Sequence, residues 1–132
     1  MSKLFPRTAA VGIISALALG TIVSLPAYAH DGERVRRPGV CSGSSTSKVT
    51  LKHENGRSEA EFEVDSNRVG QRWNVVIKDN GVIVFSGART TTAPSGSFEV
   101  ERLIPNRTGT DAVVASAKNP ATDESCVARA SI

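Results

Sequence analysis

The chain has 132 residues and a formal net charge of +3, which is the size of one domain with a single core. From Pro38 onward, 11 basic residues are balanced by 11 acidic residues, so the positive excess belongs to the first 37 residues. A nucleic-acid-binding protein concentrates lysine and arginine on one face to displace counterions from phosphates. The balanced charge after Pro38 therefore gives no reason to expect a nucleic-acid partner.

The first 29 residues have the organisation of a secretory signal peptide. Lys3 and Arg7 precede an apolar run over residues 9–25, and Ala-Tyr-Ala at residues 27–29 forms a cleavage motif. Glycine, serine and threonine interrupt the run, which falls short of the roughly 20 apolar residues of a membrane span. We therefore expect a secreted protein in the extracellular or cell-wall space, without a stable membrane anchor, beginning at His30.

Residues 30–47 are predicted to form a flexible arm, because they are basic and serine-rich and do not alternate between apolar and polar. Three readings remain open for its basic part, residues 34–37. These residues could form a solvated arm, an electrostatic tether to an anionic wall or membrane surface, or a processing site that ends at Arg37.

Cys41 and Cys126 are the only cysteines. In an exported chain, an even pair of cysteines is most simply a disulfide. Neither cysteine has a histidine or a second thiolate at the short spacing that a catalytic or metal-binding thiol requires. The sequence therefore predicts a structural Cys41–Cys126 disulfide that brackets most of the domain.

The remainder, residues 48–132, shows period-two alternation separated by turn signals, which predicts an all-β domain with seven strands. In the first hairpin, a two-residue Asn-Gly turn pairs Leu51 with Ala60 and Lys52 with Glu59. The same register pairs Val49 with Phe62 and Lys48 with Glu63. Apolar pairs on one face and opposite charges on the other are typical of a half-buried antiparallel pair.

The second hairpin, over residues 72–78 and 82–86, is predicted to have a three-residue loop at residues 79–81. This loop pairs Ile77 with Ile83 and Val75 with Phe85, and it places Trp73 on the same apolar face. Three further strands are expected at residues 97–103, 111–117 and 125–131. Seven strands at this spacing indicate an antiparallel sandwich.

Two segments carry a resemblance to known domains. Phe-x-Val at residues 98–100 with Leu-Ile-Pro-Asn at 103–106, and Val-x-Ala-x-Ala-x-Asn at 113–119, resemble strands E and F of fibronectin type III and related immunoglobulin-like domains. The whole chain is similar to small secreted actinobacterial β-sandwich proteins of unassigned function. The resemblance implies a fold and no catalytic residues. The chain departs from these families in lacking a tyrosine corner, since its only tyrosine is Tyr28.

The resemblance also implies how the strands divide between two sheets. The strands that begin near residues 48, 58 and 97 are expected in one sheet, and those near 72, 82, 111 and 125 in the other, with Trp73 between them. The implied Cys41–Cys126 bridge differs from the intersheet disulfide of antibody domains, because it ties the entry segment to the last strand.

Catalysis is not expected. The sequence has no Gly-x-Ser-x-Gly motif, and His30 and His53 are its only histidines. A glutamate row at residues 59, 61 and 63 suggests calcium or glycosidase carboxylates, but alternate glutamates facing lysines are more often a solvated strand face. All four aromatic residues of the mature chain occupy apolar strand faces, which leaves no platform for stacking sugars.

We therefore expect a secreted, monomeric, non-catalytic β-sandwich module without a cofactor, which binds an unknown protein or cell-wall partner. An exposed sheet edge and the polar loop over residues 88–96 are the surfaces expected to bind this partner. The alternative is an extracellular copper-binding protein. In that case the amine and ring of His30 would chelate the ion, and His53 is the only possible second imidazole.

Overall fold

The computed structural model describes Gly20 and residues 32–105 and 108–132. His30 and, apart from Gly20, the predicted signal peptide lie outside the described residues. Nine strands and no helix are present in the described part of the chain. The strands are β1 (Arg34–Pro38), β2 (Val40–Cys41), β3 (Thr46–Glu54), β4 (Arg57–Asp65), β5 (Arg72–Asp79), β6 (Val82–Thr90), β7 (Ser97–Ile104), β8 (Ala112–Lys118) and β9 (Ser125–Ser131).

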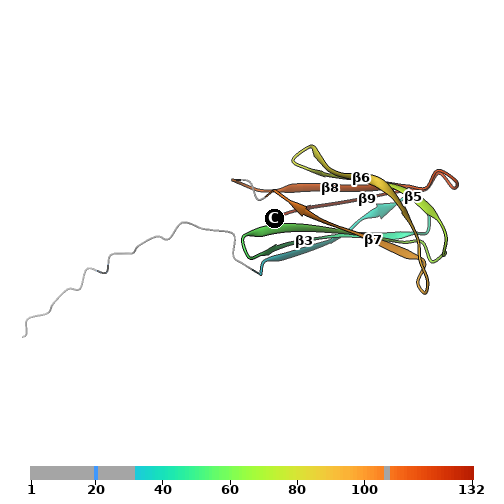
Figure 1. The fold of residues 1–132 in the computed structure, drawn as a ribbon, viewed down its shortest axis with the longest axis horizontal. Helices are drawn as coiled ribbons and strands as arrows, with labels where there is room; N and C mark the ends of the chain where they lie inside the picture. The colour runs from blue at the N-terminus through green and yellow to red at the C-terminus, as the bar shows by residue number, and fades with distance from the viewer. Residues whose placement is uncertain (1–19, 21–31, 106–107) are drawn as a thin grey trace, which may run out of the picture.

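Two antiparallel sheets pack against each other as a sandwich (Figure 1). The first sheet has the strand order β1-β3-β4-β7, and the second has the order β2-β9-β8-β5-β6. The predicted division of strands between the two sheets is confirmed. No helix in the described part of the chain is long and apolar enough to cross a membrane.

The predicted count of seven strands is wrong, because β1 and β2 add two strands within residues 30–47. Four of the five β1 side chains are exposed, so the segment shows no alternation, and its main chain pairs with β3 instead. Gly39 lets the chain pass from one sheet to the other. A Cβ atom there would lie 2.7 Å from the carbonyl oxygen of Val127, closer than any side chain tolerates.

The first hairpin has the predicted register, with Leu51 opposite Ala60 and Lys52 opposite Glu59. Asn55 and Gly56 form its turn, with φ angles of 52° and 69°. Two consecutive left-handed residues give the turn the twist of the flanking strands, which is why Asn-Gly is favoured there. Turn chemistry and side-chain pattern therefore specify one register.

The second hairpin differs from the prediction. Its turn is also a two-residue Asn-Gly turn, and Lys78 lies opposite Ile83. A β-bulge follows, so that Ile77 pairs with Phe85 and not with Ile83. The extra residue in β6 absorbs the mismatch between the turn and the apolar pattern. As a result Phe85 returns to the core at 6% exposure, while Ile83 is 57% exposed.

The core lies between the two sheets, and Trp73 occupies its centre as predicted, at 1% exposure. Its ring lies 6.4 Å from that of Phe98, which belongs to the opposite sheet. Other fully buried core residues are Val49, Leu51, Ala60, Phe62, Val64, Ile77 and Ala115. The alternation that buries these side chains also directs their neighbours along each strand outward.

The predicted disulfide between Cys41 and Cys126 is present. The two residues lie opposite each other in β2 and β9, with their Cα atoms 4.0 Å apart. Because β2 has only two residues, it cannot form a long hydrogen-bond ladder, and the disulfide provides the attachment instead. It fastens the entry segment to the last strand of the second sheet.

Candidate functional site

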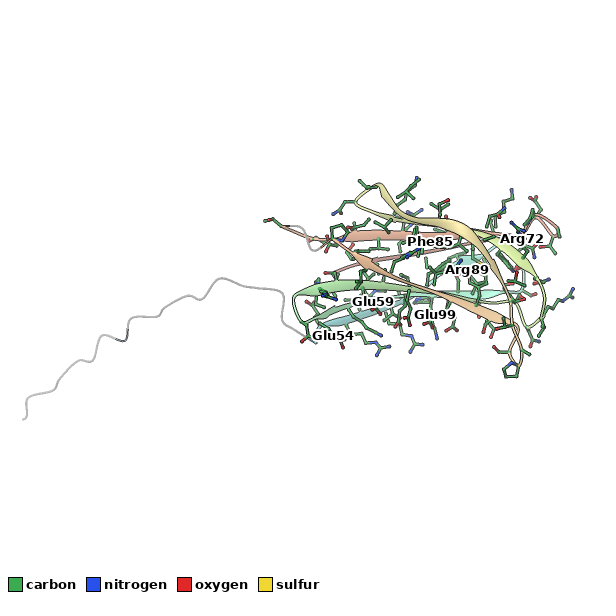
Figure 2. The ribbon with its side chains drawn as sticks, in the orientation of Figure 1. Glu54, Glu59, Arg72, Phe85, Arg89 and Glu99 are labelled. Carbon is green, nitrogen blue, oxygen red and sulfur yellow. A yellow bond between two sulfur atoms is a disulfide. The ribbon has the colours of Figure 1, made fainter. Side chains whose placement is uncertain are left out.

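On the outer face of the first sheet, basic and acidic side chains occupy two separate halves. Strands β1 and β3 supply the basic half. Strands β4 and β7 supply the acidic half, which includes Glu59 and Glu99 (Figure 2). We call this surface the charged face; it consists of Arg34, Arg36, Lys48, Lys52, Glu59, Glu61, Glu63, Glu99 and Glu101. These residues share one face because each alternates with a core residue along its strand.

Two ion pairs join the halves where β3 meets β4. The Lys48 Nζ atom lies 3.3 Å from Glu63 Oε1. Lys52 stands opposite Glu59 as predicted, but its ammonium group reaches diagonally to Glu61, with Nζ and Oε1 2.5 Å apart. This hydrogen bond raises the pKa of Lys52. Diagonal pairs of this kind lie within reach of long side chains on neighbouring strands.

The β4–β7 boundary has no such balance. Glu61 lies opposite Glu101, and Glu63 lies opposite Glu99. Carboxylate oxygens of Glu59, Glu61 and Glu101 all lie within 4.8 Å of one another. Like charges placed directly opposite in a sheet repel each other. Negative charge therefore accumulates toward β7, which is the last strand of this sheet.

The accumulated charge perturbs two carboxyl groups. Partial burial, together with the neighbouring Glu101, raises the pKa of Glu59. A hydrogen bond to Glu101, followed by partial burial, raises the pKa of Glu99. Both shifts have the direction expected when a carboxylate loses solvent and gains negative neighbours.

Glu101→Gln is expected to raise the free energy of unfolding at pH 7 by about 0.5 kcal/mol, because it removes one member of a like-charge pair. A raised carboxyl pKa means that the folded state holds its proton more tightly than the unfolded state. Stability is then lost as pH rises above the ordinary glutamate value of 4.5. The variant should therefore lose less stability between pH 4.5 and pH 7 than the wild type.

Urea unfolding at pH 5 and pH 7 measures both effects. Glu124→Gln, immediately before β9 and outside the charged face, is the matched control and should leave stability and its pH dependence unchanged. A loss of stability at pH 7 in Glu101→Gln would contradict the repulsion that the register implies.

Sequence reasoning identified the glutamate row of β4 but missed Glu99 and Glu101. The signal was available, since Phe98 and Val100 alternate with these two glutamates. What was not recognised is that β7 pairs with β4 in a register that opposes glutamate to glutamate. The sequence pattern shows only that the β4 glutamates lie opposite the lysines of β3.

A serine–histidine pair lies at the end of the sandwich formed by the β3–β4 hairpin. Ser58 Oγ and His53 Nδ1 are 2.6 Å apart, and the two residues lie opposite each other in β4 and β3. A serine beside a histidine is the arrangement of many hydrolase nucleophiles. Here Ser58 is 0% exposed and His53 is 5% exposed, so no external substrate reaches either group.

Only one of the two candidate copper ligands, His53, belongs to the described residues. His30 lies outside the described residues, and the ring of His53 is buried with Nδ1 engaged by Ser58. No observation from the described residues favours a copper centre.

The Thr-rich segment, predicted as an adaptable loop over residues 88–96, is tied to the rest of the fold. Its first three residues belong to β6. Thr91 is 1% exposed, and its hydroxyl donates to the carbonyl oxygen of Arg68 at 2.5 Å and accepts from the Gln71 amide at 2.9 Å. Thr91 therefore braces the β4–β5 connection, while Thr90 and Thr92 on either side of it are exposed.

Phe85 closes the side of the sandwich where β6 and β7 approach each other. The guanidinium carbon atoms of Arg89 and Arg102 each lie 4.8 Å from the centroid of its ring (Figure 2). Such cation–π contacts cover the aromatic edge of the core. This agrees with the expectation that Phe85 is a core residue and not an exposed stacking platform.

No protein-family model, curated protein or solved structure matches the chain significantly.

Proposed function

We propose that this protein is a secreted, non-catalytic β-sandwich module that binds a partner, or assembles, at the cell exterior through the charged face. The observation that carries the proposal is the separation of charge on this face. Sheet faces that only contact water usually mix both signs. Here acidic side chains gather on β7, at a sheet edge that has no neighbouring strand among the described residues.

The disulfide supports a location outside the cytoplasm. Disulfides persist in oxidising compartments and are rare where glutathione and thioredoxin keep thiols reduced. The bond agrees with the signal-peptide motif over residues 1–29, which supplies the route of export.

A binding or structural role fits the side chains better than catalysis. Among the described residues, His53 and Ser58 form a hydrogen-bonded pair with the chemistry of a base and a nucleophile, but both are buried. The glutamates of the charged face are paired with lysines or crowded by one another along the outer side of one sheet. Paired catalytic carboxylates instead flank a cleft that holds the substrate.

The immunoglobulin-like assignment belongs to the same proposal. Seven of the strands divide between the sheets as the resemblance to fibronectin type III domains implies. In this scheme β1 and β2 are two halves of a first strand that changes sheets at Gly39. Domains of this architecture serve many functions, so the proposed role depends on the charged face and not on the fold.

Site-specific photo-crosslinking in the producing organism tests the proposal. A photoreactive residue placed at Glu99, on the charged face, should give a defined crosslinked product. The same residue at Arg129, exposed on β9 of the other sheet, is the matched control and should give none. Equal crosslinking at both positions, or none at Glu99, would contradict a binding role for the charged face.

A further inference from the structure

The two edges of the first sheet are open except at Ser97, the first residue of β7, whose main chain already pairs with Thr92. Among the described residues, β1 pairs only with β3, and β7 pairs within its sheet only with β4. An edge strand presents unpaired main-chain groups that form a template for another strand. The two edges run antiparallel to each other, because each neighbouring pair across the sheet is antiparallel. A β1 strand laid beside β7 of another copy would therefore continue the antiparallel sheet.

The main-chain N–H and C=O groups that would form this ladder belong to charged residues on both edges. The main-chain amide of Gly39 donates to the carbonyl oxygen of Ser47. The N–H and C=O groups of alternate β1 residues therefore point toward β3, and those of Arg34 and Arg36 point away from it. The amide of Ser66 donates to Gly96, so by the same alternation Glu99 and Glu101 of β7 face away from β4.

One register between these edges pairs both outward-facing arginines of β1 with glutamates of β7. With Arg34 opposite Glu101, Arg36 falls opposite Glu99, and all four side chains lie on the outer face. One residue further along, Glu33 falls opposite Arg102. A shift of two residues in either direction keeps the hydrogen-bonding pattern but leaves only one arginine–glutamate pair. The charges therefore specify a single register.

The same charges oppose the competing pairings. Two β1 edges would bring arginines together, and two β7 edges would bring glutamates together. Like charges directly opposite are destabilising, a device that natural sheets use against unwanted edge contacts. Only contact between unlike edges combines an open ladder with charge complementarity.

We propose that the partner of the charged face is a second copy of this chain, which adds its β1 edge to the β7 edge of the first. This inference rests on the proposed function and names the partner. A pair of copies joined in this way retains one free β1 edge and one free β7 edge, so the contact is head-to-tail and propagates into open chains. Arg34 and Arg36 of the next copy then offset the excess negative charge on β7. The sequence predicts a monomer, and the proposed contact replaces that expectation.

Sedimentation velocity of the secreted protein, from about 10 µM to about 1 mM, measures this association. We expect larger species as concentration rises, and their loss in high salt because the charges are exposed. Two charge-reversal variants, R34E/R36E and E99R/E101R, should each associate about tenfold more weakly, because each has two edges of the same sign. An equimolar mixture of the two variants restores opposite edges and should recover association.

The mixture separates a lost contact from a misfolded variant, since misfolded chains cannot complement each other. Wild-type protein that stays monomeric over this range at low salt would overturn the inference. Association that neither variant weakens, or that mixing fails to restore, would also overturn it. A Glu99 crosslink to a different protein, with a monomeric wild type, would overturn self-association while leaving the proposed function intact.

Discussion

Removing the disulfide is expected to lower the free energy of unfolding by about 4 to 5 kcal/mol in the chain-entropy account of such bonds. Cys41 and Cys126 are 85 positions apart, so the bond restricts nearly the whole domain in the unfolded state. Cys126 is fully buried and Cys41 is half-buried. The least disruptive replacement is therefore Cys126→Ala with Cys41→Ser.

Urea unfolding of the oxidised wild type and of the double variant measures this loss. A decrease of this size approaches the whole stability of a small domain, so most of the variant should be unfolded at physiological temperature. Reductant is the control: it should destabilise the wild type and leave the variant unchanged. A difference below about 1 kcal/mol between the oxidised wild type and the variant would show that the bond does not constrain the unfolded chain.

Trp73→Ala is expected to cost about 3 to 5 kcal/mol, the range for truncating a large buried aromatic side chain. Trp73 is 1% exposed, and it contacts Phe98 across the two sheets. Its loss opens a cavity at the place where the layers meet. Its indole Nε1 atom has no hydrogen-bond partner among the described residues.

Trp73→Phe is the matched variant. It keeps an aromatic ring between the sheets and removes an unpaired polar group, so its cost should stay below about 1.5 kcal/mol. Thermal or urea unfolding of both variants, with folding checked by circular dichroism, measures the contrast. Similar losses in the two variants would mean that the indole nitrogen holds a partner and that ring volume is not the main contribution.

The first hairpin could be predicted in full because two independent signals agree. Asn55-Gly56 specifies a two-residue turn, and the alternation on both sides pairs Leu51 with Ala60. In the second hairpin the signals compete. The apolar pattern favours a three-residue loop, while the Asn-Gly pair favours a two-residue turn, and a bulge satisfies both.

Strands β1 and β2 could not be predicted, because what stabilises them is not local. The β1 side chains are largely exposed, and β2 consists of two residues. Main-chain pairing with β3 and β9, together with the disulfide, holds them in place. A composition of arginine, glycine and serine gives no sign of such pairing.

The charged face was only half visible in the sequence for a similar reason. The lysines of β3 and the glutamates of β4 belong to one hairpin, so local register reveals their pairing. Glu99 and Glu101 reach the same face from β7, more than 30 residues further along the chain. Only the sheet order shows that acidic side chains meet there.

The intact mass of the protein recovered from the culture fluid of its own host shows whether the chain is exported and closed by the disulfide. We expect a chain that begins at His30, with a mass about 2 Da below that of the reduced form because of the disulfide. Under native spray conditions we also expect multiples of this mass. A protein retained inside the cell, with residues 1–29 attached and both thiols free, would contradict the account of an exported, disulfide-closed binding module.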